Sequence, residues 1–430
     1  MTSRRYIVGA WFNDFSRTSL CNFVNDSGDG QRLAAGVDSL RGWLVVAATF
    51  LSTATIFGVT YSFTTFLSAM SDEFGSGNGS TAILFGLTIF FLFVLGLPAG
   101  RASDRWGPRP VVLVGCAAMV SGLLLTSMVD RIWLGYLTYG FGIGVGAACC
   151  YVPLVSQVSG WFERYRAVAL GIAVSGVGVG TLVGPPIADA LIQENGWRWT
   201  YRVFAAACLV SLFIVAALAF RAPRAADQSP LDLRAVLRSP VFRSMYLAGF
   251  LMTLALFVPF VFLVPYAEEQ GMSSAAAAAL ISILGIGSMA GRLILGMFVN
   301  MVGLMRLYQI SFGILGGSFA IWLFGGDSYL ALAIFAFVLG TSYGGYVALS
   351  PAAAAELFGL VGLGTVLGAL YTAGGAGGLI GPAVAGWLID TTGSYRPAII
   401  FALVIGMLSA LVLRSAIAAS ARGSAESVVG

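Results

Sequence analysis

Long apolar stretches separated by short polar turns make up most of this sequence. A helix needs about 20 mostly apolar residues to cross a hydrocarbon core of about 30 Å. Twelve stretches come close to this length, so the pattern predicts an all-α polytopic membrane protein with twelve transmembrane helices. Their approximate bounds are 43–69, 80–102, 111–128, 133–159, 167–192, 200–220, 244–266, 275–299, 307–326, 329–354, 364–390 and 397–419.

One connection is long and polar, and it divides the twelve spans six and six. It runs from Arg221 to Arg243 and carries five arginines and two aspartates. The segment before the first span is rich in Arg, Asp, Asn, Ser and Gly, as flexible tails are. We therefore expect a flexible cytoplasmic tail, a six-helix bundle, a cytoplasmic loop, a second six-helix bundle and a short cytoplasmic tail. Their bounds are 1–41, 42–220, 221–243, 244–420 and 421–430.

The composition limits the chemistry of the chain. Of its 430 residues, 58% are hydrophobic and 10% charged, which excludes an ordinary water-soluble surface. All 23 basic residues are arginine and none is histidine, so imidazole bases, histidine metal ligands and lysine Schiff bases are excluded. The five cysteines form no C-x-x-C pair. We expect a bilayer protein with no enzyme activity, no cofactor, no metal site and no nucleic-acid partner.

The arginines also predict the orientation, because cations near the ends of spans stay on the cytoplasmic side. With both termini inside, the inner segments hold eighteen arginines and the outer loops hold four, and one more lies within a span. We therefore expect a multi-pass protein of the plasma membrane, or of the inner membrane in a bacterium, with both termini cytoplasmic. The four outer arginines are Arg131, Arg198, Arg202 and Arg396.

Two sequence landmarks repeat in the two halves. The turn after the second span, from Gly100 to Arg109, is echoed from Gly296 to Arg306 after the eighth span, 196 residues later. Gly184-Pro185 in the fifth span recurs as Gly381-Pro382 in the eleventh, 197 residues later. Duplicated halves of this kind are typical of secondary transporters. The repeat predicts two pseudo-symmetric six-helix halves.

The turn after the second span resembles a motif of the major facilitator superfamily. That family carries Gly-x-x-x-Asp-Arg-x-Gly-x-Arg at this place, and Gly100 to Arg109 match it. An aspartate and arginines in such a turn can bond a neighbouring helix end in one conformation and release it in another. A merely solvated turn is the alternative interpretation. The predicted gating residues, including those of the repeated turn, are Asp104, Arg105, Arg109, Asn300 and Arg306.

A narrower resemblance is to the monocarboxylate porter family. Its fifth-helix signature, an aromatic residue and Phe, a basic cluster and Ala-x-Gly-x-Ala, is matched from Trp161 to Gly176, although Tyr165 interrupts the basic cluster. A second signature before the first helix is half matched by Asp38 to Trp43. The resemblance implies a carrier of small organic anions, similar also to oxalate and formate exchangers.

Arg292 is the strongest candidate for contact with a ligand. It lies about seventeen residues into the eighth span and eight residues before Asn300. Burying an arginine at this depth costs about 2.5–3.5 kcal/mol on insertion scales, so it should face a partner or a watery cavity. Eight helical residues span about 12 Å, which disfavours snorkelling to the interface. The guanidinium fork matches a carboxylate, and the resemblance implies a substrate-binding arginine in this helix.

We expect polar aromatic side chains, rather than further charges, around Arg292. A buried tyrosine hydroxyl needs a partner, although a backbone carbonyl often provides it. In the tenth span either Tyr343 or Tyr346 could serve. The substrate-binding residues predicted beside Arg292 are Tyr61, Tyr151, Tyr346 and Tyr371.

The sequence does not support proton coupling by a carboxylate beside Arg292. Members of the resembled family often carry such a carboxylate one turn earlier, together with a first-helix lysine, and here these positions hold Ser288 and Tyr61. In the eleventh span Gly374 stands where the oxalate and formate exchangers carry a lysine for a second negative charge.

We therefore predict a secondary transporter of small monocarboxylates, such as lactate or pyruvate, working by alternating access as a monomer. The co-transported species is a proton or an exchanged anion. The alternatives are an oxalate/formate-type exchanger and a non-transporting anion sensor. A drug exporter would carry carboxylates in the middle of a span, and this chain has none there.

Overall fold

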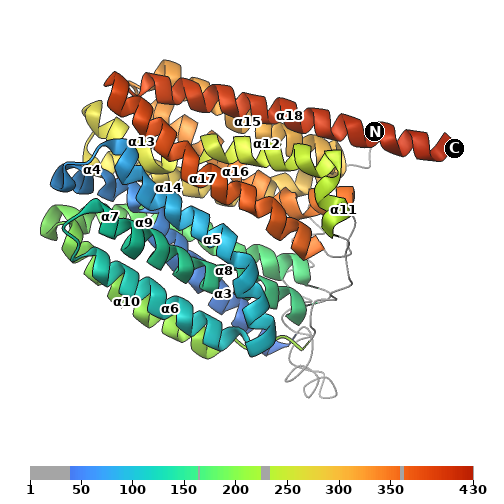
Figure 1. Ribbon diagram of the computed structural model, residues 1–430, viewed down its shortest axis with the longest axis horizontal. Coiled ribbons are helices and arrows are strands. Elements are labelled where there is room, and N and C mark those ends of the chain that lie inside the picture. Colours follow the sequence, from blue (N-terminus) through green and yellow to red (C-terminus); the bar gives the residue numbers. More distant parts are fainter. Residues whose placement is uncertain (1–38, 163–164, 224–232, 359–362, 430) are drawn as a thin grey trace, which may run out of the picture.

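The computed structural model describes residues 39–162, 165–223, 233–358 and 363–429. In these residues the first half of the chain holds nine helical segments, coloured blue to green in Figure 1. They are α3 (Leu40–Tyr61), α4 (Phe63–Phe74), α5 (Asn78–Trp106), α6 (Pro108–Thr126), α7 (Ile132–Gly135), the π-helix η1 (Tyr136–Ile143), α8 (Gly144–Trp161), α9 (Arg166–Asn195) and α10 (Trp197–Leu218).

The second half, yellow to red in Figure 1, has the same succession of spans. Helix α11 lies within the predicted central loop, and α18 continues past residue 420, where we expected the second bundle to end. The helices are α11 (Leu233–Arg238), α12 (Pro240–Leu256), α13 (Pro259–Glu269), α14 (Ser274–Val302), α15 (Leu304–Gly325), α16 (Tyr329–Phe358), α17 (Leu363–Thr392) and α18 (Arg396–Val429).

The described residues contain twelve segments long and apolar enough to cross a membrane, which confirms the predicted twelve-span, all-α fold. The first span of each half is broken. Helix α12 ends at Leu256 and α13 starts with Pro259, whose ring cannot continue the preceding helix. At the equivalent break between α3 and α4, the Ser62 hydroxyl donates to the Gly58 carbonyl at 2.5 Å.

The positions of glycines with positive φ repeat in the two halves with the same offsets as the sequence landmarks. Gly107 ends α5 and Gly303 ends α14, with φ of 89° and 91°, and they lie 196 residues apart. Gly196 follows α9 and Gly393 follows α17, with φ of 78° and 64°, 197 residues apart. Only glycine adopts such φ values without strain, so the offsets of the sequence repeat are also offsets of these turns.

Glycines allow close crossings within each half. A Cβ at Gly180 on α9 would collide with the Ala54 carbonyl of α3. In the second half, a Cβ at Gly381 on α17 would collide with the Leu254 carbonyl of α12. Small residues let transmembrane backbones approach without a gap. Within the fifth-helix signature this explains Gly176, where a Cβ would collide with the Phe50 carbonyl, but not Gly171, where a Cβ would meet no described heavy atom within 4 Å.

The two halves meet along two long helix pairs, α5 with α17 and α9 with α14, and at one end along α4 with α13. At this end the Thr64 hydroxyl of α4 donates to the Val261 carbonyl of α13 at 3.1 Å. We call it the α4–α13 end; it lies at the left of Figure 1. The opposite, arginine-rich end carries Arg105, Arg109 and Arg221.

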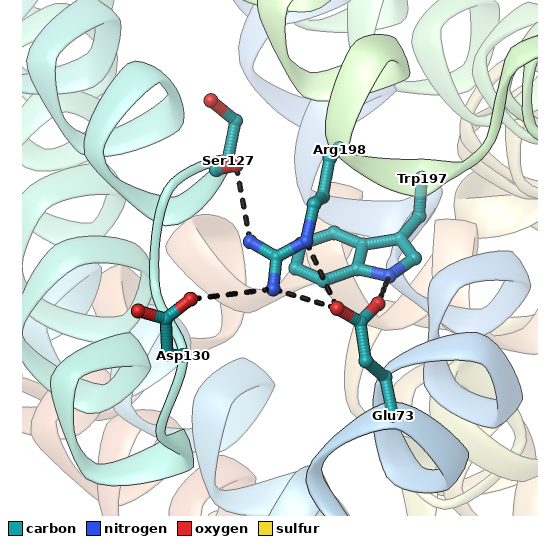
Figure 2. Close-up of polar contacts among 5 residues, drawn as sticks. All are labelled: Glu73, Ser127, Asp130, Trp197 and Arg198. Carbon is teal, nitrogen blue, oxygen red and sulfur yellow. Dashed lines mark hydrogen bonds and ion pairs between the residues drawn. The ribbon is translucent and has the colours of Figure 1, made fainter.

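A polar cluster ties the first half together at the α4–α13 end (Figure 2). Glu73 at the end of α4 accepts hydrogen bonds from the Trp197 indole at 2.5 Å and from Arg198 Nη2 at 2.7 Å. Arg198 Nη1 also donates to the Ser127 carbonyl at 3.1 Å, and Asp130 lies 3.9 Å from Nη2. One predicted outer arginine thus joins α4, α10 and the turn after α6.

Candidate functional site

A cavity of about 60 Å³ lies between the two halves of the molecule. Its walls come from α3, α5, α8 and α9 of the first half and from α12, α14, α16 and α17 of the second, with Phe257 between α12 and α13. Most of the lining is aromatic or aliphatic. The residues are Phe57, Phe93, Tyr151, Val177, Thr253, Leu256, Phe257, Arg292, Tyr343, Tyr346, Val347, Ser350, Tyr371 and Gly374.

Arg292 lines this cavity from α14, as the sequence suggested. Its Nη1 donates to the Val174 carbonyl of α9 at 2.7 Å, so the side chain bridges the two halves. Its Nε is buried and has no hydrogen-bond acceptor among the described residues, and the guanidinium carbon lies 6.0 Å from the centre of the Tyr343 ring. Among the described residues, no carboxylate lies within 4.0 Å of Arg292. The guanidinium therefore keeps one buried donor without a partner, beside the cavity, in the described part of the chain.

Close helix crossings place Arg292 at the cavity. A Cβ at Gly291 would collide with the Thr341 carbonyl of α16, and a Cβ at Gly344 would collide with the Ser288 carbonyl of α14. Helices α14 and α16 are thus locked backbone to backbone on one face. The next residue, Arg292, points to the other side, toward α9.

Three of the four predicted tyrosines line the cavity: Tyr151, Tyr346 and Tyr371. Tyr151 packs edge-on against Phe57, with ring centres 5.3 Å apart. Tyr371 packs against Phe93 at 6.0 Å. These contacts join helices of both halves into one aromatic wall, but they do not test whether the hydroxyls bind a ligand.

Tyr61 lies behind this wall and is not part of the lining. Its hydroxyl shares a hydrogen bond of 3.0 Å with the hydroxyl of Tyr343, which does line the cavity. Its ring packs at a tilt of 35° against Phe260 of the other half, with ring centres 4.2 Å apart. Tyr61 can therefore act on a ligand only through Tyr343 in this conformation.

Sequence analysis missed several lining residues, among them Phe93, Thr253, Phe257 and Ser350. Each is an ordinary apolar or hydroxyl residue within an apolar span. Periodicity does not distinguish a face packed in a core from one that lines a cavity. No signal in the sequence could have selected them.

The predicted gating turn of the first half contacts its own half. Arg221 Nη2, just after α10, donates to the backbone carbonyl of Asp104 at 2.6 Å. Arg109 Nη2 donates to the Ala217 carbonyl at 3.0 Å. These bonds hold the turn after α5 against the end of α10.

The remaining gating residues lie at the same end. The guanidinium of Arg105 lies over its neighbour Trp106, 5.7 Å from the ring centre. Arg306 is exposed in the first turn of α15. Asn300 belongs to α14, but its side chain is outside the described part of the chain. The gating role of all five residues stays a prediction.

Metal chemistry finds no support in the described residues. They contain no group of three or more His, Cys, Asp or Glu side chains that could hold a metal ion. The four cysteines of these residues, Cys116, Cys149, Cys150 and Cys208, are free.

Known proteins with similar sequences are membrane carriers. The model of the Major Facilitator Superfamily matches residues 49–362 and 246–427. The agnestins efflux protein of Paecilomyces divaricatus is 28% identical over 380 residues, 87% of this chain and 87% of that protein. Monocarboxylate transporter 12 of Xenopus laevis is 27% identical over 391 residues, 83% of this chain and 84% of that protein.

The fold is also similar to solved structures. The nucleoside transporter NupG aligns with a TM-score of 0.69, covering 87% of this chain and 99% of that one. Its sequence identity is 15%, so this likeness concerns the fold alone.

Proposed function

This chain belongs to the Major Facilitator Superfamily and is a membrane transporter rather than an enzyme, and we propose that its substrates are small organic monocarboxylates. The substrates are anions of the lactate and pyruvate kind, carried across the membrane by alternating access of the two halves. One observation carries the proposal: the Nε edge of Arg292 is buried, without an acceptor, at a cavity between the halves.

The chemistry of the site favours one negative charge. Nε and Nη2 form one edge of a planar guanidinium and fit the two oxygens of a carboxylate. Arg292 supplies the only charged side chain in the described lining, so a second negative charge would be unpaired there. An unpaired charge in a partly desolvated cavity costs several kcal/mol.

The size of the cavity favours a short acid. One water needs a cavity of about 10–15 Å³, so a cavity of about 60 Å³ has room for a small solute only. Lactate and pyruvate are among the smallest organic acids. The aromatic wall then packs against the carbon chain, while the tyrosine hydroxyls and Ser350 offer hydrogen bonds to a hydroxyl or keto group.

Arg292 also provides a link between binding and movement. The residue belongs to the second half, and its Nη1 bonds a carbonyl of the first. A carboxylate bound at the Nε edge weakens or strengthens the bond from Nη1 to the Val174 carbonyl. The affinity for the carboxylate therefore differs between conformations in which this bond is kept and conformations in which it is broken. A ligand shifts a conformational equilibrium only through such a difference in affinity.

Transport assays test the proposal directly. Purified protein in proteoliposomes is offered radiolabelled lactate, pyruvate, acetate, formate and oxalate, with and without a pH gradient or internal counter-substrate. We expect saturable uptake of at least one monocarboxylate, inhibited by the others and weakly by oxalate. Binding without uptake would favour a sensor, and no binding of any acid would contradict the proposal.

The direction of transport is a separate question, because one similar protein is an efflux protein. Export of a monocarboxylate uses the same site and differs only in the gradients that drive it. Uptake into inverted vesicles compared with right-side-out vesicles distinguishes the two directions.

A further inference from the structure

A hydroxyl bridges two carboxylates where the halves meet at the α4–α13 end. Ser274, in the first turn of α14, lies with its Oγ 2.5 Å from Asp189 Oδ1 and 2.7 Å from Glu268 Oε1. Asp189 belongs to α9 of the first half, whereas Ser274 and Glu268 belong to the second. Asp189 is only 6% exposed, and its other oxygen accepts a bond from Gln193 at 2.9 Å.

The number of hydrogens at this bridge is the informative feature. A serine hydroxyl has one hydrogen and can donate to one carboxylate only. The second carboxylate, if ionised, faces the lone pairs of Oγ at hydrogen-bond distance. One additional proton, carried by either carboxyl group, gives both contacts a hydrogen. Both hydrogen bonds of the bridge between the halves therefore form only when one of the two carboxyl groups is protonated.

The neighbouring charges do not compensate. The acidic groups Glu269, Asp390 and Asp327 act on Tyr266 and Tyr395, near Glu268, and Glu194 is exposed further along α9. The cation that follows Tyr395 in the chain, Arg396 of α18, is exposed. Among the described residues, no cation lies within 4.0 Å of Asp189 or Glu268.

The nearest cations on the neighbouring helix α10 have other partners. Arg198 pairs with Glu73 of α4, and Arg202 Nε donates to the Ser127 hydroxyl at 3.3 Å. On α4 itself the remaining charge is Asp72, which is exposed. A proton is thus the positive charge that this bridge lacks.

The second helix pair has a bridge of another type. Asp390 at the end of α17 accepts three hydrogen bonds from the start of α5: from Asn78 N at 2.9 Å, Asn78 Nδ2 at 3.0 Å and Gly79 N at 2.9 Å. All donors here are amides, which suit an ionised carboxylate at a helix N-terminus. This bridge needs no proton and serves as a natural control.

We propose that Asp189, Ser274 and Glu268 form a proton-dependent latch that holds the two halves together at the α4–α13 end. Separation of α9 from α14 takes Asp189 away from the serine and releases the proton. The closed end binds one proton more than the open end, so acidification favours closure and alkaline conditions favour opening. This inference rests on the bridge alone and does not depend on the identity of the substrate.

Distance measurements test the latch without any substrate. Spin labels on Met128→Cys and Ser328→Cys, two exposed residues of opposite halves at this end, report separation in a background with the native cysteines replaced by alanine. We expect the closed population to fall as the pH is raised. The closed-to-open ratio changes by at most tenfold per pH unit, the limit for one proton.

Three variants identify the groups. Glu268→Gln supplies an amide hydrogen in place of the proton, so the end should stay closed with no dependence on pH. Ser274→Ala removes the shared hydroxyl and should raise the open population while abolishing the pH response. Asp390→Asn should weaken closure equally at every pH and keep the response, because its bridge involves amides only.

Two results would overturn the proposal. One is a wild-type distance distribution that does not change with pH. The other is a response that survives in Glu268→Gln or disappears in Asp390→Asn. Size-exclusion profiles of each variant show whether it remains folded, and lactate uptake measured separately keeps this result distinct from the substrate assignment.

Discussion

Arg292 makes one hydrogen bond that holds its side chain in place, and one of its donors has no partner among the described residues. The bond from Nη1 to the Val174 carbonyl fixes the guanidinium, while the buried Nε has no acceptor. A buried donor without an acceptor costs about 1–3 kcal/mol, and an anion in the cavity would recover this cost. The residue thus has the features of a binding group rather than of a structural ion pair.

Replacement of Arg292 should therefore remove binding. We expect Arg292→Ala to lower substrate affinity by about 10- to 100-fold, the equivalent of about 1.5–3 kcal/mol for charged hydrogen bonds. Arg292→Lys should lose less, because it keeps the charge but not the fork. Isothermal titration with purified, monodisperse protein measures both. Wild-type affinity in the alanine variant would refute the site.

Gly374 lines the same cavity, and we predict that it sets the charge preference there. A Cβ there would lie 3.6 Å from Phe93 and 3.8 Å from Thr253, which is ordinary contact, so a side chain fits. We expect Gly374→Lys to raise the affinity for oxalate relative to lactate by about tenfold, since it pairs the second charge. Competition binding of the two acids measures the ratio, with Gly374→Met as a control for size.

The same substitution should cost stability in the empty protein. Two cations in one small cavity repel each other, and the repulsion is relieved only by a dianion. We expect a lower midpoint of thermal unfolding for Gly374→Lys without ligand and its recovery with oxalate. An unchanged oxalate preference would mean that a second negative charge is paired elsewhere.

At the scale of helices, glycines decide how closely neighbours approach, and two glycines of α9 allow a matched comparison. A Cβ at Gly180 would collide with the backbone of α3, whereas Gly171 has no heavy atom within 4 Å of such a Cβ. Alanine is otherwise favoured over glycine in a helix by about 1 kcal/mol. Comparison of the two positions thus distinguishes the effect of packing on stability from the effect of helix propensity.

We expect Gly180→Ala to destabilise the protein by about 1–3 kcal/mol, because overpacking forces the backbones apart. Gly171→Ala should be neutral or slightly stabilising. Thermal unfolding of both variants in the same detergent provides the comparison. Equal midpoints of thermal unfolding in the two variants would show that moving α3 and α9 apart does not lower the stability of the protein.

At the scale of the whole molecule, the two halves are joined at the α4–α13 end and along two helix pairs, while the gating turn at the opposite end contacts its own half. Alternating access requires contacts at this opposite end in the other conformation. The turn around Asp104 is the predicted provider of those contacts.

We expect Asp104→Asn to shift the population of conformations while leaving the affinity of each one unchanged, since the residue is not part of the cavity lining. Labelling of cysteines placed at both ends measures the shift. Identical labelling in wild type and variant would leave only the role of a solvated turn.

The twelve spans, their division into two halves, the repeat and the family could all be predicted from the amino-acid sequence. These features depend on hydrophobic length, on glycine turns and on local motifs, all of which are properties of consecutive residues. The sequence also identified Arg292 and three lining tyrosines, because a charge or hydroxyl in an apolar span stands out against its neighbours.

Three features could not be predicted and are seen only in the folded protein: which apolar residues face the cavity, the place of Tyr61 behind Tyr343, and the contact of Asp189 with Ser274 across the halves. Residues 61 and 343, like 189 and 274, are far apart in the chain. Their contacts arise from the rotation of each helix about its axis and from its crossing with a distant partner. Those quantities are fixed by packing between helices, which no local pattern in the sequence records.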